Sequence, residues 1–156
     1  MNTTEYERLM QAGIRFVSYR PRSEKEIRGY LAKKLETYRM SDPTLIERVM
    51  TRLRELDYVN DDKFAAWWIS QRQGHAPKGM RLISRELKEK GIEIDMRHAE
   101  NETDLACRAV EKKMLRWRGL PLVEQKRKLY GFLGRRGFAP ETIARVIDEL
   151  VPGRVQ

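Results

Sequence analysis

The feature of this sequence that most constrains its fold is an apolar helical pattern that recurs three times along the chain. Ile27, Leu31 and Leu35 follow one another at four-residue intervals and form a single stripe on one helix face. The same spacing recurs in two later segments, at Ile83 with Leu87 and at Leu129 with Leu133. The aligned segments are 23–35, 79–91 and 126–137. Such a repeat is typical of a chain built from tandem helical units that bury their apolar faces against their neighbours.

Start signals place individual helices within these repeats. Ser23-Glu24-Lys25-Glu26 has the pattern of a capping box, in which the serine and the second glutamate satisfy free backbone donors. Asp42 before Pro43 predicts a helix with the aspartate as N-cap and the proline at the first position. The expected apolar face of that helix consists of Ile46, Val49, Met50, Leu53 and Leu56. Strand-like alternation is absent over any useful length, so the predicted fold class is all-α.

The pattern predicts three tandem three-helix repeats at residues 5–58, 60–101 and 103–151, followed by a tail at 152–156. The third helix of the middle repeat, near 94–102, is short and polar, which weakens the match there. Units that contact mainly their neighbours would form an elongated, curved, right-handed array with one long concave side. The alternative is a single globule of nine helices.

Composition limits the kind of protein this chain can be. Charged residues make up 35% of the sequence, and 32 basic residues against 23 acidic ones give a net charge of +9. That surplus suits a polyanion such as nucleic acid, or an acidic protein surface. The first residues show no secretory signal, and no apolar run approaches the roughly 20 residues of a membrane helix. Since Cys107 is the only cysteine, no internal disulfide can form, and we expect a cytoplasmic protein.

The residue types that most often carry catalysis are few and scattered. Asp61 and Asp62 could form a paired-carboxylate metal site, but they stand where a helix should begin, which favours capping of that helix. His75, His98 and Cys107 do not have the spacing of zinc ligands. We expect both histidines to be solvated and Cys107 to be a small buried apolar residue. The sequence therefore predicts neither an enzyme nor a bound metal or cofactor.

Basic side chains are the main candidates for a binding surface. The segment 112–136 holds nine of them against one acidic residue, Glu124, and such an imbalance favours the approach of phosphate-rich or acidic partners. A second basic cluster covers 20–34. For any one of these residues, an ordinary solvated face is the alternative. The predicted partner-binding residues, with one tryptophan among them, are Arg20, Arg22, Lys25, Arg28, Trp67, Arg72, Lys78, Arg81, Lys112, Lys113, Arg116, Arg118, Lys126, Arg127, Lys128, Arg135 and Arg136.

Trp67 and Trp68 are adjacent aromatic residues in one predicted helix. Neighbouring helical positions point about 100° apart, so both rings cannot lie on one narrow stripe. Phe64 and Ile69 share a face with Trp68, which predicts core packing for Trp68. For Trp67, an interface role and plain partial burial are equally open.

Four ordered stretches cover most of the chain and together form a specific set of motifs. The most recognisable is the junction Tyr58-Val59-Asn60-Asp61-Asp62-Lys63-Phe64-Ala65. The other stretches are Ser23-Glu24-Lys25-Glu26-Ile27, Lys78-Gly79-x-Arg81-x-Ile83 continuing to Ile92, and Lys128-Leu129-x-x-Phe132-Leu133 continuing to Phe138. In this order the four stretches resemble the RecX family. Asp57 is a departure, because the family usually has a glycine there. The left-handed backbone expected at that helix end favours glycine over aspartate.

The resemblance implies three tandem three-helix repeats in a monomeric regulatory protein that binds the filament of the RecA recombinase. It also implies weak binding of single- or double-stranded DNA. The implied activity is inhibition of ATP hydrolysis and strand exchange by RecA, in DNA repair, homologous recombination and the SOS response. Without the resemblance, charge alone would indicate the alternative function, a stand-alone basic helical module that binds nucleic acid.

Overall fold

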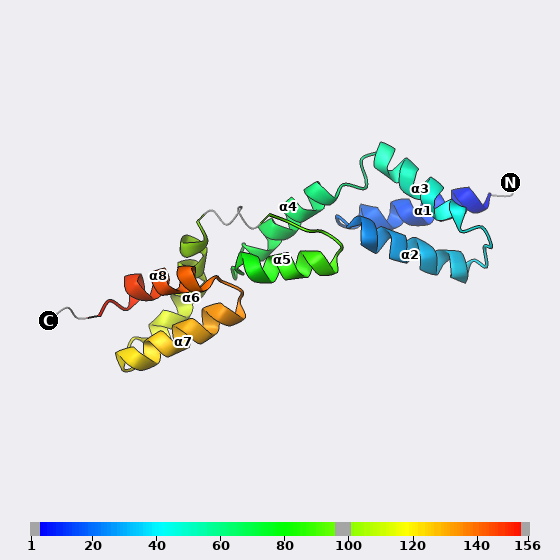
Figure 1. Ribbon diagram of the computed structural model, residues 1–156. Helices are drawn as coiled ribbons and strands as arrows, with labels where there is room; N and C mark the ends of the chain where they lie inside the picture. Colours follow the sequence, from blue (N-terminus) through cyan, green and yellow to red (C-terminus); the bar gives the residue numbers. More distant parts are fainter. Residues whose placement is uncertain (1–3, 96–100, 154–156) are drawn as a thin grey trace. The chain divides into compact units, whose positions relative to one another are not determined.

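The computed structural model describes residues 4–95 and 101–153, and every regular element within these ranges is an α-helix (Figure 1). The helices are α1 Glu5–Ser18, α2 Glu24–Thr37, α3 Thr44–Glu55, α4 Asp61–Arg72, α5 Met80–Glu89, α6 Glu102–Trp117, α7 Leu122–Arg135 and α8 Pro140–Leu150. The prediction of an all-α fold is therefore confirmed.

The chain divides into two compact units, each with its own packed residues. The first unit comprises the described residues up to Trp67 together with Glu89–Ile92, and the second comprises Trp68–Lys88 and the described residues from Glu93 onward. The middle repeat is thus shared between the two units. This division does not fit the alternative of a single nine-helix globule.

Helices α1, α2 and α3 enclose the core of the first repeat. Ile27, Leu31, Val49 and Leu53 are fully buried there, as the stripe of the sequence predicts. The prediction is wrong for one residue of the apolar face of α3, since Leu56 is 41% exposed. Helix α3 ends at Glu55 and leaves Leu56 at the C-cap, whereas Leu45, one turn before Val49, fills the core instead and is 3% exposed.

Helices α6, α7 and α8 enclose an equivalent core in the third repeat. Ala106 and Val110 of α6 meet Leu129 and Leu133 of α7, and Val146 of α8 completes the group. All five side chains are fully buried. Because Leu129 and Leu133 align with Ile27 and Leu31 of the first repeat, the two cores are built from equivalent positions.

Local signals at the helix ends behave mostly as predicted. The capping box of α2 is present, with the Ser23 hydroxyl accepting from the Glu26 backbone N–H at 3.2 Å. Asp42 accepts a hydrogen bond from the Thr44 N–H at 2.9 Å, although α3 begins at Thr44 rather than at Pro43. Asp57 has a φ of 59°, which confirms the left-handed backbone expected at this position.

Asp61 and Asp62 lie in the first turn of α4, as predicted, but a different side chain caps that helix. The Asn60 side chain accepts from the Lys63 N–H at 3.0 Å and so satisfies the start of α4. Asp61 instead accepts from the backbone N–H of Glu24, the first residue of α2, at 2.8 Å. No group of three or more metal-ligating side chains occurs within the described residues.

The second unit repeats this long-range cap at the equivalent position. Glu102, the first residue of α6, is 7% exposed and accepts from the backbone N–H of Met80, the first residue of α5, at 3.0 Å. Its other carboxylate oxygen accepts from the Thr142 hydroxyl at 2.7 Å. Met80 aligns with Glu24, so in both cases the second helix of one repeat is capped by the first residue of the next repeat's opening helix.

Three minor predictions have different outcomes. His75 lies in an exposed bend, as expected, whereas His98 lies outside the described residues. Cys107 packs against the core of the third repeat but is only partly buried, and burial raises the pKa of its thiol. The predicted helix near 94–102 falls largely outside the described residues.

Candidate functional site

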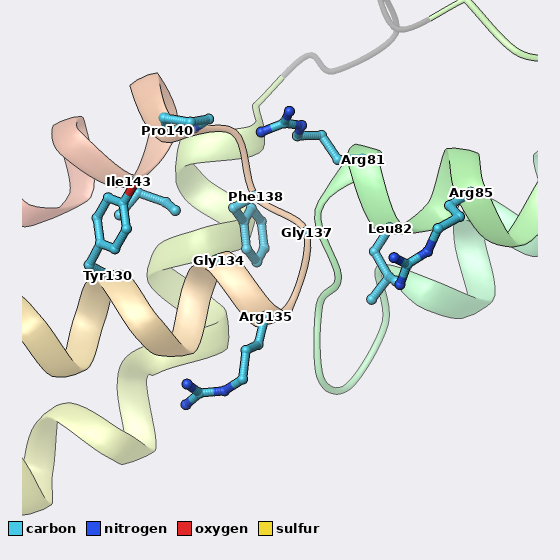
Figure 2. A pocket seen from close by; sticks show the side chains of 10 residues that line it. All are labelled: Arg81, Leu82, Arg85, Tyr130, Gly134, Arg135, Gly137, Phe138, Pro140 and Ile143. Atoms are coloured by element: carbon cyan, nitrogen blue, oxygen red, sulfur yellow. The ribbon is translucent and has the colours of Figure 1, made fainter.

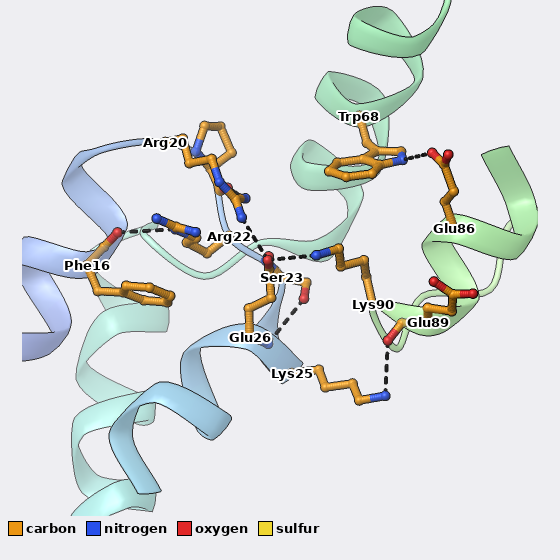
Figure 3. A network of polar contacts seen from close by, with 11 residues as sticks. Phe16, Arg20, Arg22, Ser23, Lys25, Glu26, Trp68, Glu86, Glu89 and Lys90 are labelled. Carbon is orange, nitrogen blue, oxygen red and sulfur yellow. Dashed lines mark hydrogen bonds and ion pairs between the residues drawn. The ribbon is translucent and has the colours of Figure 1, made fainter. Parts of the chain in front are cut away.

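The basic residues of the first predicted cluster are engaged in contacts within the first unit. The carboxylate of Glu26 accepts from Arg20 at 2.8 Å, from Lys90 at 2.9 Å and from the Ser23 backbone N–H at 3.0 Å (Figure 3). Burial alone would raise the pKa of the Glu26 carboxyl, but these hydrogen bonds outweigh it and lower the pKa from 4.5 to about 2. Arg20 is therefore held in an internal ion pair.

Three neighbouring candidates have internal contacts as well. The Arg22 guanidinium lies 4.1 Å from the ring centroid of Phe16, and its Nε donates to the Phe16 carbonyl at 3.3 Å. The Lys25 ammonium donates to the backbone carbonyl of Glu89 at 3.0 Å. Arg28 forms ion pairs with two carboxylates, those of Glu24 and Glu47. A role of these residues in binding a partner stays a prediction.

The carboxylate of Glu86 forms hydrogen bonds with two of the predicted partner-binding residues of the middle repeat. Glu86 accepts from Arg72 and Lys78 at 2.7 Å each and from the indole N–H of Trp68 at 3.0 Å. Burial alone would raise the pKa of the Glu86 carboxyl, but its hydrogen bonds lower it below the usual range. Trp68 is therefore half-buried and hydrogen-bonded rather than a core residue, because its indole N–H needs a polar partner. Trp67 is also half-buried, with its ring centroid 5.7 Å from that of Phe64.

Two candidates of the third repeat lie over one aromatic ring. Lys113 and Arg136 lie 5.7 Å and 5.0 Å from the ring centroid of Phe132. Arg136 also donates to the backbone carbonyl of Ala76 at 3.0 Å, so it joins the α7–α8 turn to the segment before α5. Lys126 is half-buried on α7.

The remaining candidates are exposed and, within the described part of the chain, form no ion pair. They are Arg81, Lys112, Arg116, Arg118, Arg127, Lys128 and Arg135. All seven belong to the second unit. The imbalance of charge predicted for 112–136 therefore corresponds to a surface whose cations face solvent and are available to a partner.

One part of this surface is concave. A hollow of about 440 Å³ lies between α5 on one side and α7 with the start of α8 on the other (Figure 2). Arg81 and Arg85 line it from α5, and Tyr130 and Arg135 line it from α7. Tyr130 is 56% exposed. Arg85 and Tyr130 were not predicted, although Arg85 lies one helical turn after Arg81 and could have been found by its spacing.

Two glycines bring the walls of the hollow together. The Gly79 N–H donates to the Arg136 carbonyl at 2.8 Å, and the Arg81 N–H donates to the Gly137 carbonyl at 3.2 Å. A Cβ on Gly79 would lie 2.3 Å from the Gly137 oxygen, so only glycine permits this approach. Gly137 also has a φ of 82°, which favours glycine for a second reason.

The arrangement of its helices in tandem units defines the chain as a helical-repeat protein. Family profiles for the first, second and third three-helix domains of RecX match residues 10–53, 60–96 and 100–147. The chain belongs to the RecX family of regulatory proteins, and its fold of three tandem three-helix repeats is confirmed.

Individual relatives support this assignment. The regulatory protein RecX of Bacillus subtilis is 33% identical over 153 residues, covering 94% of this chain and 56% of that protein. The regulatory protein RecX of Prosthecochloris aestuarii is 32% identical over 155 residues, covering 97% of this chain and 99% of that protein. The chain thus spans about half the length of several relatives and nearly the whole length of another.

A solved structure shares the fold. The crystal structure of RecX from Lactobacillus salivarius superposes with a TM-score of 0.77 at 23% identity and covers 93% of this chain and 96% of that chain. Among the described residues, no helix has the length and apolar character needed to cross a membrane.

Proposed function

We propose that this protein binds RecA and its DNA filament and lowers ATP hydrolysis and strand exchange by RecA. Through this activity it modulates DNA repair and homologous recombination in the cytoplasm, as a monomer and without catalysis of its own. Membership of a regulatory family supports the proposal. The structural observation that carries it is the set of exposed cations in the second unit that form no ion pair within the described residues.

The physical basis is the summed charge of that surface. A RecA filament carries the phosphates of its DNA, and long-range attraction to them depends on how many cations face the partner. This attraction is screened over roughly 8 Å at physiological salt. Single exposed charges contribute little to fold stability, typically within about 1 kcal/mol each. Charge reversal on this surface should therefore weaken binding without unfolding the chain.

The test measures DNA-dependent ATP hydrolysis by RecA with and without this protein. We expect inhibition by the wild-type chain and loss of most of it when the exposed residues Arg116, Arg127 and Lys128 are changed to Glu. The control changes three exposed cations outside the predicted set to Glu, namely Arg15, Lys88 and Arg145, which alters the net charge equally. Circular dichroism should show unchanged helicity in both variants.

Two results would count against the proposal. Absence of any effect of the wild-type chain on RecA at stoichiometric ratios, together with absence of binding, would remove it. Tight and steeply salt-dependent binding to DNA without any effect on RecA would instead favour the stand-alone nucleic-acid-binding module.

A further inference from the structure

The hollow in the second unit has an equivalent in the first. The alignment that places Ile27 on Ile83 also places Lys25 on Arg81 and Gly29 on Arg85. Lys25 and Gly29 line a hollow of about 430 Å³ between α2 and the segment Glu89–Ile92, which holds the end of α5. Two homologous hollows therefore exist, and a comparison of their linings shows what distinguishes them.

The first hollow has carboxylates among its lining residues, and two of its three lysines form contacts within the first unit. Its lining contains the carboxylates Glu26 and Glu89 beside its lysines. Glu26 is bonded to Lys90 at 2.9 Å, and Lys25 is bonded to the Glu89 carbonyl at 3.0 Å. Its aromatic ring, Tyr30, is stacked on Phe16 with centroids 4.0 Å apart. Lys25 and Lys90 thus hold α2 to the segment Glu89–Ile92, and Tyr30 packs against Phe16 of α1.

The second hollow is lined by arginines, and its lining differs from that of the first. The position of Glu26 is taken by Leu82, and the position of Glu89 is taken by Arg135. No carboxylate occurs among its lining residues, and its three arginines form no ion pair within the described residues. Its exposed ring, Tyr130, has no ring partner within those residues. Since backbone contacts of Gly79 and Gly137 hold this junction, the arginines are not needed to do so.

We propose that this hollow binds single-stranded DNA, with successive backbone phosphates bound by Arg81, Arg85 and Arg135, whose guanidinium groups point in different directions (Figure 2), and with a base stacked on Tyr130. The guanidinium fork of arginine matches the geometry of phosphate oxygens. An exposed tyrosine ring stacks on any base, so binding is tolerant of sequence. The inference rests on the proposed function in taking DNA as the ligand, and it deepens that function by assigning the strand a site.

The tyrosine favours a single strand over the two other candidate ligands. Bases in a duplex are already stacked on each other, and a ring can reach their faces only by unstacking them. An acidic peptide would use the arginines but would gain nothing specific from an aromatic ring with an open face. The hollow should therefore bind a single strand more tightly than a duplex of equal length.

The first experiment measures binding of the full chain to fluorescein-labelled oligothymidine by anisotropy, without RecA and at several salt concentrations. Each of the changes Arg81→Ala, Arg85→Ala and Arg135→Ala should weaken binding about fivefold at low salt. Each should also reduce the slope of log affinity against log salt by about 0.7, the value for one phosphate contact on a single strand. The control is Lys88→Ala, which should have little effect, because Lys88 is an exposed cation of α5, like Arg81 and Arg85, but lies outside the hollow.

The second experiment isolates the ring. Tyr130→Phe should retain affinity for the oligonucleotide, because the ring is kept, whereas Tyr130→Ala should weaken it about tenfold. Binding to a duplex of the same length should be affected equally by both substitutions. Unchanged circular dichroism establishes that each variant is folded.

The results separate this inference from the proposed function. If the arginine variants bind oligothymidine normally but no longer inhibit RecA, the hollow binds an acidic protein surface and the single-strand assignment is overturned. If Lys88→Ala weakens binding as much as the hollow variants do, the surface acts diffusely and the assignment is again overturned. If the wild-type chain binds oligothymidine through the hollow but leaves RecA unaffected, only the proposed function fails.

Discussion

The second helix of the first repeat, α2, and the second helix of the middle repeat, α5, each contact the segment that ends the second helix of the next repeat. The two contacts, here called junctions, are made by different kinds of interaction. In the first unit, Lys25 and Glu26 of α2 contact Glu89 and Lys90 through side chains. In the second unit, the backbone of α5 contacts the backbone of the α7–α8 turn at two glycines. Charged side chains that hold a junction together are not available to a ligand. A backbone contact at glycine involves no charged side chain. The comparison therefore explains why Lys25 and Lys90 of the first hollow are engaged in internal contacts, whereas the arginines of the second hollow form no ion pair within the described residues.

The long-range caps show what the junctions have in common. Asp61 and Glu102 occupy equivalent places, and each accepts from the first backbone N–H of a preceding second helix. A buried N–H without such a partner would destabilise the fold by about 1–3 kcal/mol. Both junctions thus provide a carboxylate acceptor for the first backbone N–H of the helix, and they differ in the side chains around that hydrogen bond.

The largest expected effect tests whether the repeats share one packing scheme. Leu31 and Leu87 align and are both fully buried, so Leu31→Ala and Leu87→Ala should each destabilise the chain by about 2–5 kcal/mol. Urea denaturation followed by circular dichroism measures this. A urea denaturation curve unchanged by either substitution would show that the stripe does not form the core of its repeat.

The next effect tests the glycine junction directly. Gly79→Ala would place a Cβ 2.3 Å from a backbone oxygen, which the surrounding backbone must move to accommodate, and the expected loss is about 1–3 kcal/mol. Hydrogen exchange should rise at the start of α5. The control is Gly29→Ala, where nothing lies within 4 Å of the added Cβ, and where the expected change is a gain of roughly 0.5–1 kcal/mol. Equal stability of both variants would contradict the role of the close contact.

Much of the fold was predictable because its signals are local. The capping box at Ser23 and the apolar stripe through Ile27 and Leu31 depend on residues only a few positions apart. The same holds for Asp57, whose left-handed backbone follows from its place at a helix end. Leu56 was assigned to the core wrongly because a periodic pattern does not show where the helix stops.

The candidate site was less predictable because it depends on contacts across the sequence. No local pattern indicates that Asp61 would cap α2 or that Glu102 would cap α5. Charge runs could not separate Arg20, which is paired to Glu26, from Arg135, which is exposed. That distinction, and the presence of Tyr130 and Arg135 in the lining of one hollow, required the structure. The predicted elongation and curvature of the array stay predictions.

A smaller effect should follow from the charge network of the first junction. The pKa of Glu26 is about 2 in the folded chain and 4.5 ordinarily, so its stabilising effect is fully present above pH 4.5 and is lost as the pH falls toward 2. Glu26→Gln should lower stability at neutral pH by on the order of 1–2 kcal/mol, after allowance for the partly exposed partners.

The measurement compares thermal melts of the wild type and Glu26→Gln between neutral pH and pH 2. The difference between the two should shrink as the pH falls through this window. Glu36→Gln is the control, since Glu36 is an exposed carboxylate of the same helix with no ion pair in the described residues. A difference that persisted undiminished at low pH would mean that the carboxylate charge does not hold this junction.

The smallest expected effect is a gain of binding at the first hollow. Gly29→Arg with Glu89→Arg would give that hollow the arginines that its homologue has at Arg85 and Arg135. Both changes should be tolerated, because the Cβ at Gly29 meets open space and Lys25 bonds the backbone of Glu89 rather than its side chain.

These two substitutions, called the graft, are best made in a chain whose second hollow no longer binds DNA because Arg81, Arg85 and Arg135 are changed to Ala. Oligothymidine affinity should then recover by about threefold, with a rise of about 1–1.5 in the salt slope from two added cations. Recovery should stay incomplete, because Tyr30 is already stacked on Phe16 and offers no open ring. The control pairs Gly29→Ala with Glu89→Gln, which removes a charge without adding any. If the graft binds no better than this control, added charge is not enough to turn a structural hollow into a binding one, and the exposed ring of Tyr130 would be the feature that separates them.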